Sequence, residues 1–198
     1  MPPRYSVAVF CGSRLGFDPA FAAAAERLGL GLARAGIRLV YGGGKNGMMG
    51  VLADAVLAGG GTVLGVIPDF LTKWEVAHPR VTEMEITDSM HSRKRRMAEE
   101  SDAFVALPGG IGTMDETIEI ISWRMLRLHD KPIYICDVAG SAALLETAVD
   151  GMIAQGFAVA ETRSLFTVVD GVDALLARLE QALKDGETRG AEMRAERL

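Results

Sequence analysis

Three glycine-rich segments of this sequence have residue types and a spacing that could bind a ligand. Each follows a short apolar run: Cys11-Gly12-Ser13, then Gly42–Gly47, then Pro108–Thr113. Glycine lets backbone N–H groups approach phosphate oxygens closely, and a helix that follows adds the positive end of its dipole. One such segment could be no more than a tight turn between a strand and a helix. Two glycine-rich segments that each lead into a helical pattern favour phosphate binding instead.

The middle segment also matches a dinucleotide-binding fingerprint. Gly42-x-Gly44-x-x-Gly47 follows an expected strand and precedes an expected helix. The acidic residue that should hold a ribose is met only loosely, by Asp69 in an expected loop. A P-loop is excluded, because Lys45 precedes the last glycine and no lysine–serine or lysine–threonine pair follows. A dinucleotide-binding oxidoreductase is therefore a weak alternative.

Two cations fall on a helical stripe that should face inward. In an expected helix over Ser89–Glu100, one face is formed by Met90, Arg93, Lys94 and Met97. Burying two cations between methionines is costly unless an anion receives them. The alternative is that this face is only half-buried and the cations extend into solvent.

Glu116 also allows two interpretations. Thr113-x-x-Glu116 has the spacing of a capping box, in which the glutamate closes the start of a helix. The same spacing puts a carboxylate one turn beyond a phosphate-binding loop, where the ribose of a nucleotide would lie. The local pattern by itself slightly favours the cap.

Alternating strand and helix patterns must position these residues. They predict an α/β fold, a doubly wound parallel sheet with helices on both faces, whose loops meet at the carboxyl ends of the strands. The expected strands are Tyr5–Phe10, Arg38–Tyr41, Thr62–Ile67, Ala103–Leu107, Ile133–Cys136 and Leu165–Val169. The expected helices are one from Asp18 and Pro19 to Gly36, then Met48–Leu57, Ser89–Glu100, Thr113–Leu128, Ala142–Ala154 and Val172–Leu183. Pro68–Thr87 should be an irregular loop, which in a compact domain is often functional.

Length and composition exclude several classes of protein. The 198 residues fit one nucleotide-binding α/β domain over 1–184, followed by a charged, disordered tail over 185–198. A net charge of −5 and a single basic run, Arg93–Arg96, argue against a nucleic-acid partner. No apolar run reaches the roughly 20 residues that span a bilayer, and the start lacks a signal peptide, so a cytoplasmic protein without a membrane partner is expected. The 2 cysteines and 3 histidines lack metal-ligand spacing, so we expect no metal and no cofactor.

The segment Pro108–Glu116 reads PGGIGTMDE, and Met90–Lys94 lies upstream of it. Together they resemble the LONELY GUY family of cytokinin-activating phosphoribohydrolases, whose signature PGGxGTxxE is matched at every fixed position. The likeness covers most of the chain and includes Phe10–Ser13, Val40–Gly44, Gly47–Gly50, Gly65–Pro68 and Leu128–Pro132. It implies a Rossmann-like homodimer or higher homo-oligomer. Its substrate would be a purine nucleoside 5′-monophosphate, an N6-modified AMP or AMP itself, cleaved to free base and ribose 5-phosphate.

By motif match, Arg93 and Glu116 take the catalytic positions. The glycine segments and the resemblance together suggest as substrate-binding residues Gly12, Ser13, Gly43, Gly44, Glu75, Lys94, Gly109, Gly110, Ile111, Gly112, Thr113 and Ser122. The chain departs from the family at Arg124, Met125 and Arg127, where alanine, glutamine and glycine are common. These departures bear on the base preference and on the dimer surface.

The chemistry implied by the resemblance fits a carboxylate beside the ribose. Glycosyl cleavage passes through an oxocarbenium-like state, whose charge Glu116 could stabilise, or it could activate water. Arg93 would orient the substrate and contact the phosphate or the departing purine. A non-catalytic carrier of a phosphorylated ligand, such as molybdenum cofactor, is the alternative, and a carrier does not require the Arg93–Glu116 pair. Relatives labelled lysine decarboxylases fit badly, because no Schiff-base lysine with its partner groups is recognisable here.

Overall fold

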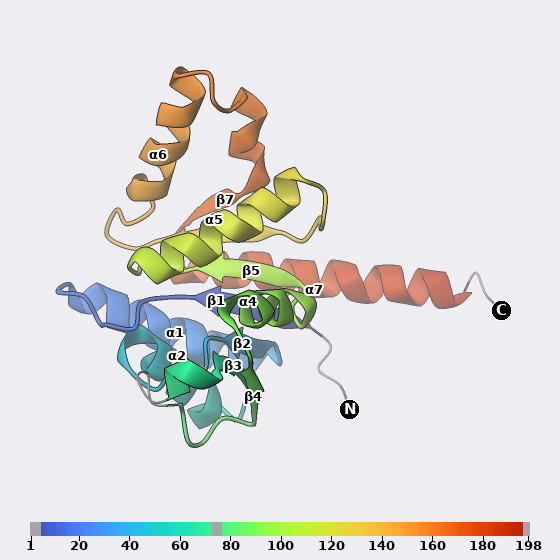
Figure 1. Cartoon of the computed structure of the whole chain (residues 1–198). Helices are drawn as coiled ribbons and strands as arrows, with labels where there is room; N and C mark the ends of the chain where they lie inside the picture. Colours follow the sequence, from blue (N-terminus) through green and yellow to red (C-terminus); the bar gives the residue numbers. More distant parts are fainter. Residues whose placement is uncertain (1–4, 73–76, 196–198) are drawn as a thin grey trace.

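The computed structural model describes residues 5–72 and 77–195. A single sheet of seven parallel strands runs through the molecule (Figure 1). The strands are β1 (Ser6–Phe10), β2 (Arg38–Tyr41), β3 (Val63–Pro68), β4 (Glu83–Thr87), β5 (Ala103–Ala106), β6 (Ile133–Asp137) and β7 (Thr167–Asp170). Their order across the sheet is β4-β3-β2-β1-β5-β6-β7, so the direction of winding reverses between β1 and β5. Ligands of such sheets bind at the carboxyl ends of the strands beside this reversal.

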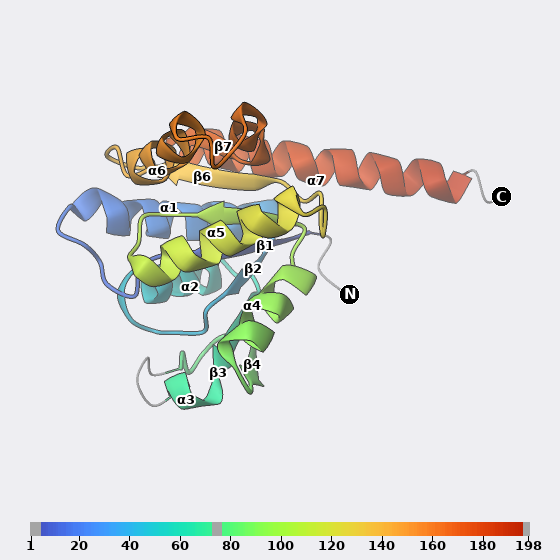
Figure 2. The same ribbon diagram turned by 45° about the horizontal axis from the view of Figure 1, so that its top comes forward.

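Helices cover both faces of the sheet, which confirms the predicted doubly wound α/β fold. They are α1 (Pro19–Ala35), α2 (Gly47–Ala58), α3 (Asp69–Leu71), α4 (Met90–Glu99), α5 (Ile111–Met125), α6 (Ala143–Ala154), the 3-10 helix η2 (Ala160–Leu165) and α7 (Gly171–Ala195). Helices α1, α2 and α7 lie on one face of the sheet and α4, α5 and α6 on the other (Figure 2). The buried side chains of each set form a separate core. No described helix is long and apolar enough to span a membrane.

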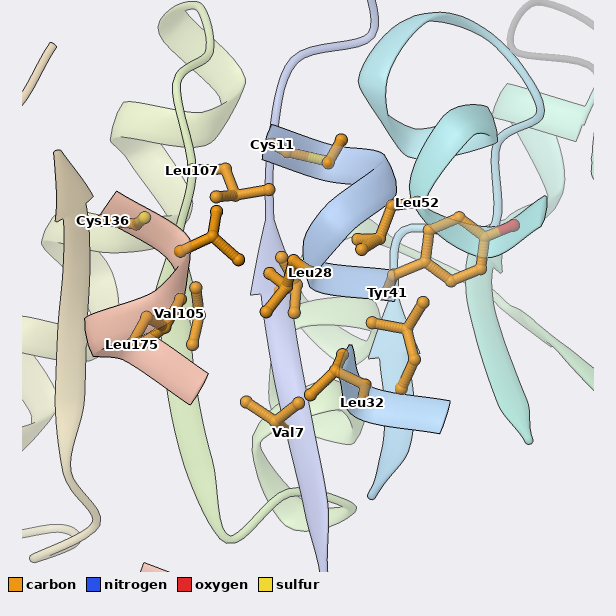
Figure 3. Packing of buried hydrophobic residues seen from close by; sticks show 14 of the residues in the cluster. Val7, Cys11, Leu28, Leu32, Tyr41, Leu52, Val105, Leu107, Cys136 and Leu175 are labelled. Carbon is orange, nitrogen blue, oxygen red and sulfur yellow. The ribbon is translucent and has the colours of Figure 1, made fainter. Parts of the chain in front are cut away.

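The core on the α1 face shows why these sequence patterns fold as they do. Leu28 and Leu32 lie one turn apart on α1, are fully buried, and contact apolar side chains of the central strands (Figure 3). Burying one leucine completely stabilises the fold by about 1.5–3 kcal/mol. The first helix also begins and ends as predicted, because Asp18 accepts a hydrogen bond from the N–H of Ala20 at 2.8 Å and Gly36 closes the end with φ 67°.

Several elements differ from the sequence prediction, among them the short helix α3, which lies in the stretch predicted to be irregular. Glu83–Thr87, in the same stretch, forms the edge strand β4, which pairs with β3 alone and leaves Glu83 and Ile86 exposed. Ala160–Leu165 forms a 3-10 helix, so the last strand begins at Thr167 instead of Leu165. Helix α7 spans Gly171–Ala195 and so runs beyond Leu183, where the sequence predicts its end. A polar helix can persist through side-chain pairs one turn apart, as Gln181 and Asp185 make at 2.8 Å.

Candidate active site

The first and third glycine segments meet where the sheet reverses its winding, and the second begins beside them. The N–H of Gly12 donates to the carbonyl oxygen of Pro108 at 3.1 Å, and the N–H of Met48 donates to the carbonyl oxygen of Gly12 at 3.1 Å. A side chain at Gly12 would bring a Cβ within 2.9 Å of the Arg14 carbonyl oxygen, so this close approach requires glycine. The loop after β1 therefore ties together the starts of α2 and of the loop before α5.

The start of α5 presents backbone N–H groups that are open to a ligand. The helix begins at Ile111 after Gly110, no side chain caps it, and Met114 makes the first intrahelical bond back to Gly110. The N–H groups of the first turn have no intrahelical partner. A Cβ added at Gly110 or Gly112 would meet nothing within 4 Å, so the space above these amides is open. This is the geometry of an anion site at a helix N-terminus.

The capping interpretation of Glu116 is wrong. Because α5 begins at Ile111, Thr113 is the third residue of the helix and not its cap. Glu116 lies further along, where its side chain is 10% exposed and faces Arg93. The capping box of this region belongs to α4 instead, where Ser89 and Ser92 exchange hydrogen bonds of 3.1 Å between backbone N–H and hydroxyl.

Arg93 is held by three parts of the fold at once. Its Nε donates to the Val66 carbonyl oxygen at 3.1 Å, and its Nη2 donates to the Gly42 carbonyl oxygen at 3.3 Å. Its Nη1 lies 3.4 Å from Oε1 of Glu116. A Cβ at Gly42 would lie 2.0 Å from Nη2, so this glycine makes room for the guanidinium. The side chain is 7% exposed, which excludes the alternative that it extends into solvent.

The buried thiol of Cys11 interacts electrostatically with the Glu116 carboxylate. Burial raises the pKa of Cys11, and the nearby Glu116 carboxylate raises it further. The thiol therefore stays protonated and is a poor nucleophile.

Lys94 lies on the same side of α5 but faces other carboxylates. Its Nζ is 3.0 Å from Oδ2 of Asp115 and 2.8 Å from Oε2 of Glu119. Burial lowers the pKa of Lys94, but the hydrogen bonds to Glu119 and Asp115 outweigh this effect and raise it. The lysine stays charged and pairs with two carboxylates of α5, whereas Arg93 pairs with Glu116.

A cavity of about 570 Å³ lies on the other side of the α5 N-terminus, within the size range of small-molecule sites. Five predicted binding residues line it: Gly12, Ser13, Gly109, Gly110 and Thr113. Thr113, Met114 and Thr117 of α5 face this cavity, whereas Glu116 faces α4. The first turn of α5 therefore stands between the cavity and the charge pair.

Comparison with known proteins decides the family. The profile of a family described as "Possible lysine decarboxylase" matches residues 49–179. A probable cytokinin riboside 5′-monophosphate phosphoribohydrolase from Oryza sativa subsp. japonica is 45% identical over 175 residues, 88% of this chain and 78% of that protein. A cytokinin riboside 5′-monophosphate phosphoribohydrolase from Rhodococcoides fascians is 41% identical over 179 residues, 90% of each chain. The chain belongs to the LONELY GUY family.

Solved structures extend the comparison to the fold. The molybdenum cofactor carrier protein from Chlamydomonas reinhardtii has a TM-score of 0.70 at 22% identity, covering 91% of this chain and 98% of that one. At this identity the likeness concerns the fold alone. The LONELY GUY signature itself, Pro108–Glu116, lies in the loop after β5 and the first turns of α5, and its last residue is Glu116.

Three other predicted site residues, Gly43, Gly44 and Ser122, lie away from the start of α5. Gly43, with φ 77°, accepts a hydrogen bond of 2.9 Å from the N–H of His78, and Gly44 forms a bridge with Ala77. This loop is thus packed against the chain itself, which argues against dinucleotide binding there. The hydroxyl of Ser122 donates to the Ile118 carbonyl oxygen at 2.8 Å, about 13 Å along α5 from Thr113. Glu75 lies outside the described residues, and Ile111 is exposed to solvent.

The sequence analysis did not identify the groups that hold the side chains of Arg93 and Lys94. The carbonyl groups of Val66 and Gly42 orient Arg93, and backbone carbonyls carry no side-chain signal. The carboxylates of Asp115 and Glu119 hold Lys94. Their spacing of four residues on one helical face could have indicated a shared cation.

Proposed function

We propose that this chain hydrolyses the N-glycosidic bond of a purine nucleoside 5′-monophosphate, AMP or an N6-modified AMP, giving free base and ribose 5-phosphate. The observation that carries the proposal is the buried Arg93–Glu116 pair, which lies one turn beyond the open amides at the start of α5. The activity named for relatives of 41–45% identity supports it.

In this proposal, the first turn of α5 binds the phosphate and the next turn carries the carboxylate that faces the ribose. The N–H groups of the first turn and the positive helix dipole would receive the 5′-phosphate. Glu116, three residues beyond Thr113, would then face the ribose and stabilise its developing positive charge or activate water. Arg93 is fixed by two carbonyl groups, so it can hold the Glu116 carboxylate in one orientation.

The alternative of a phosphorylated-ligand carrier is weaker. The resemblance to molybdenum cofactor carriers is one of fold, at 22% identity. A carrier needs the phosphate-binding amides but has no use for a buried carboxylate–guanidinium pair. By family resemblance we further infer a cytoplasmic protein that assembles as a homodimer or higher homo-oligomer.

Base release from AMP tests the proposal. With EDTA present and no cofactor added, the wild-type protein should release free adenine from AMP. Adenosine should be a far poorer substrate, because binding energy from the phosphate is spent on the reacting centre. Loss of turnover with chelator, or equal kcat/KM for the two compounds, would count against the proposed site.

The phosphate position can be tested at Gly112. A methyl group there would project into open space above the helix amides, so Gly112→Ala should fold normally and raise the KM for AMP at least about tenfold. Gly151→Ala is the matched control, since Gly151 is also helical and its Cβ would also meet nothing within 4 Å. Alanine should stabilise either helix by up to about 1 kcal/mol. A wild-type KM in Gly112→Ala would show that no phosphate contacts these amides.

A further inference from the structure

Four helices of this chain end in the same type of turn. In α1, α2 and α6 the turn is centred on a glycine in the left-handed region, Gly36 with φ 67°, Gly60 with φ 76° and Gly156 with φ 79°. In each, the residue after the glycine donates its N–H to the carbonyl group five residues earlier, at 3.0, 2.9 and 2.9 Å. This is the Schellman motif, in which glycine is favoured because it has no Cβ.

The same turn ends α5, but its left-handed residue is Arg127, with φ 60°. The N–H of Leu128 donates to the Trp123 carbonyl oxygen at 2.9 Å, five residues earlier, as in the other three turns. A residue with a Cβ is strained in this conformation, and the backbone alone would be better served by glycine. A strained residue that persists points to a use for its side chain.

Arg127 lines a second cavity, of about 510 Å³, together with Arg124, His129, Asp130 and Leu165. We call these five residues the α5 corner. The side chain of Arg127 makes no hydrogen bond or ion pair with the part of the chain that the structure describes, and Nη1 of Arg124 donates to the Leu165 carbonyl oxygen at 3.0 Å. Two arginines and one aspartate, Asp130, therefore line a space large enough for a small molecule, so cations outnumber carboxylates there.

The need to offset the negative end of the α5 dipole does not explain why residue 127 is an arginine. A cation in the last turn of a helix offsets that dipole without leaving helical geometry, and Arg124 already provides one. The imidazole of His129 is fixed beside the arginines, because its Nε2 donates to the Ile120 carbonyl oxygen at 3.1 Å and its ring lies 5.2 Å from that of Phe104. The α5 corner is thus a cationic cavity with a rigid ring in its wall.

We propose that the α5 corner binds a phosphate-bearing small molecule, whose oxygens accept hydrogen bonds from the guanidinium groups of Arg124 and Arg127. Arginine suits this role because its planar donors match two oxygens of one phosphate group. Arg127 lies about 24 Å along the helix from Ile111, so this site is separate from the amides at the α5 N-terminus. It goes beyond the proposed hydrolysis and does not depend on it.

His129 is the one histidine that lines the α5 corner, so its imidazole resonances are a probe of this site. The other two histidines, His78 and His91, do not line it and serve as internal references. We would titrate the full-length protein with inorganic phosphate at constant ionic strength and follow all three imidazoles by NMR. His129 should shift saturably with phosphate, and chloride or acetate at equal strength should not reproduce the shift. No shift of His129, or an equal shift with chloride, would overturn the proposal. A tighter response to acetate would assign the site to carboxylates and overturn it as well.

Two variants separate the guanidinium from the backbone strain. Arg127→Gly should weaken the phosphate response of His129 at least about tenfold, since one of two charged donors is lost. It should also raise Tm by about 2–4 °C because the left-handed strain is relieved. Arg127→Ala should weaken the response equally without that gain in Tm. Arg34→Ala removes an exposed charge from the last turn of α1 and is the matched control. A wild-type phosphate response in both Arg127 variants would overturn the proposal.

Discussion

Replacing Glu116 by glutamine is expected to lower kcat for base release from AMP by at least about a hundredfold. Glutamine keeps the shape of the side chain and removes its charge. The glutamate is 10% exposed, and its Oε1 lies 3.4 Å from the Arg93 guanidinium. Little water can therefore enter to take over the role of the lost carboxylate. A developing positive charge on the ribose would then lack its stabilising carboxylate. The measurement is adenine release under saturating AMP.

Asp115→Asn is the matched control for this variant. Asp115 is the adjacent carboxylate on α5, is 55% exposed, and contacts Lys94 instead of Arg93. Its loss should change kcat less than about threefold, because an exposed ion pair contributes little. Thermal unfolding of both variants shows whether the fold persists. A folded Glu116→Gln protein with near wild-type kcat would contradict the catalytic role of Glu116.

Replacing Arg93 by methionine should abolish turnover and also destabilise the protein. The change leaves the carbonyl groups of Val66 and Gly42 without their donor and Glu116 without its nearest cation. Removing one partner of a buried ion pair costs about 3–5 kcal/mol. In a chain of 198 residues we expect Tm to fall by roughly 6 °C or more.

A double variant separates the two effects of Arg93. Arg93→Met combined with Glu116→Gln removes both charges, so part of the lost Tm should return while turnover stays absent. Arg95→Ala is the control for loss of a cation from α4, since Arg95 is 70% exposed and should change Tm little. Turnover near the wild-type rate in a folded Arg93→Met protein would contradict the account of the pair.

Much of the fold follows from local sequence signals. Asp18 and Gly36 set the limits of α1 because their side chain and backbone act within one turn. The continuous apolar run of Ser6–Phe10 predicts a central strand buried on both faces, as β1 is. The edge strand β4 escaped prediction, because an edge strand pairs on one side only and carries charges that resemble those of a loop.

The site was less predictable than the fold. The motif indicated Arg93 and Glu116, but the start of α5 at Ile111 removed the local capping alternative only once the helix was seen. The contacts that fix Arg93 join residues 27 and 51 positions apart in the chain. Such contacts depend on the order of strands in the sheet, which a single sequence does not encode locally.

The identity of the products formed from AMP tests the central claim most directly. The wild-type protein with AMP and EDTA would be followed by ³¹P NMR, with adenine measured in parallel. The account predicts that AMP is converted to ribose 5-phosphate and adenine in equal amounts, with no inorganic phosphate formed. Appearance of adenosine and inorganic phosphate, or AMP left intact by folded protein, would contradict it.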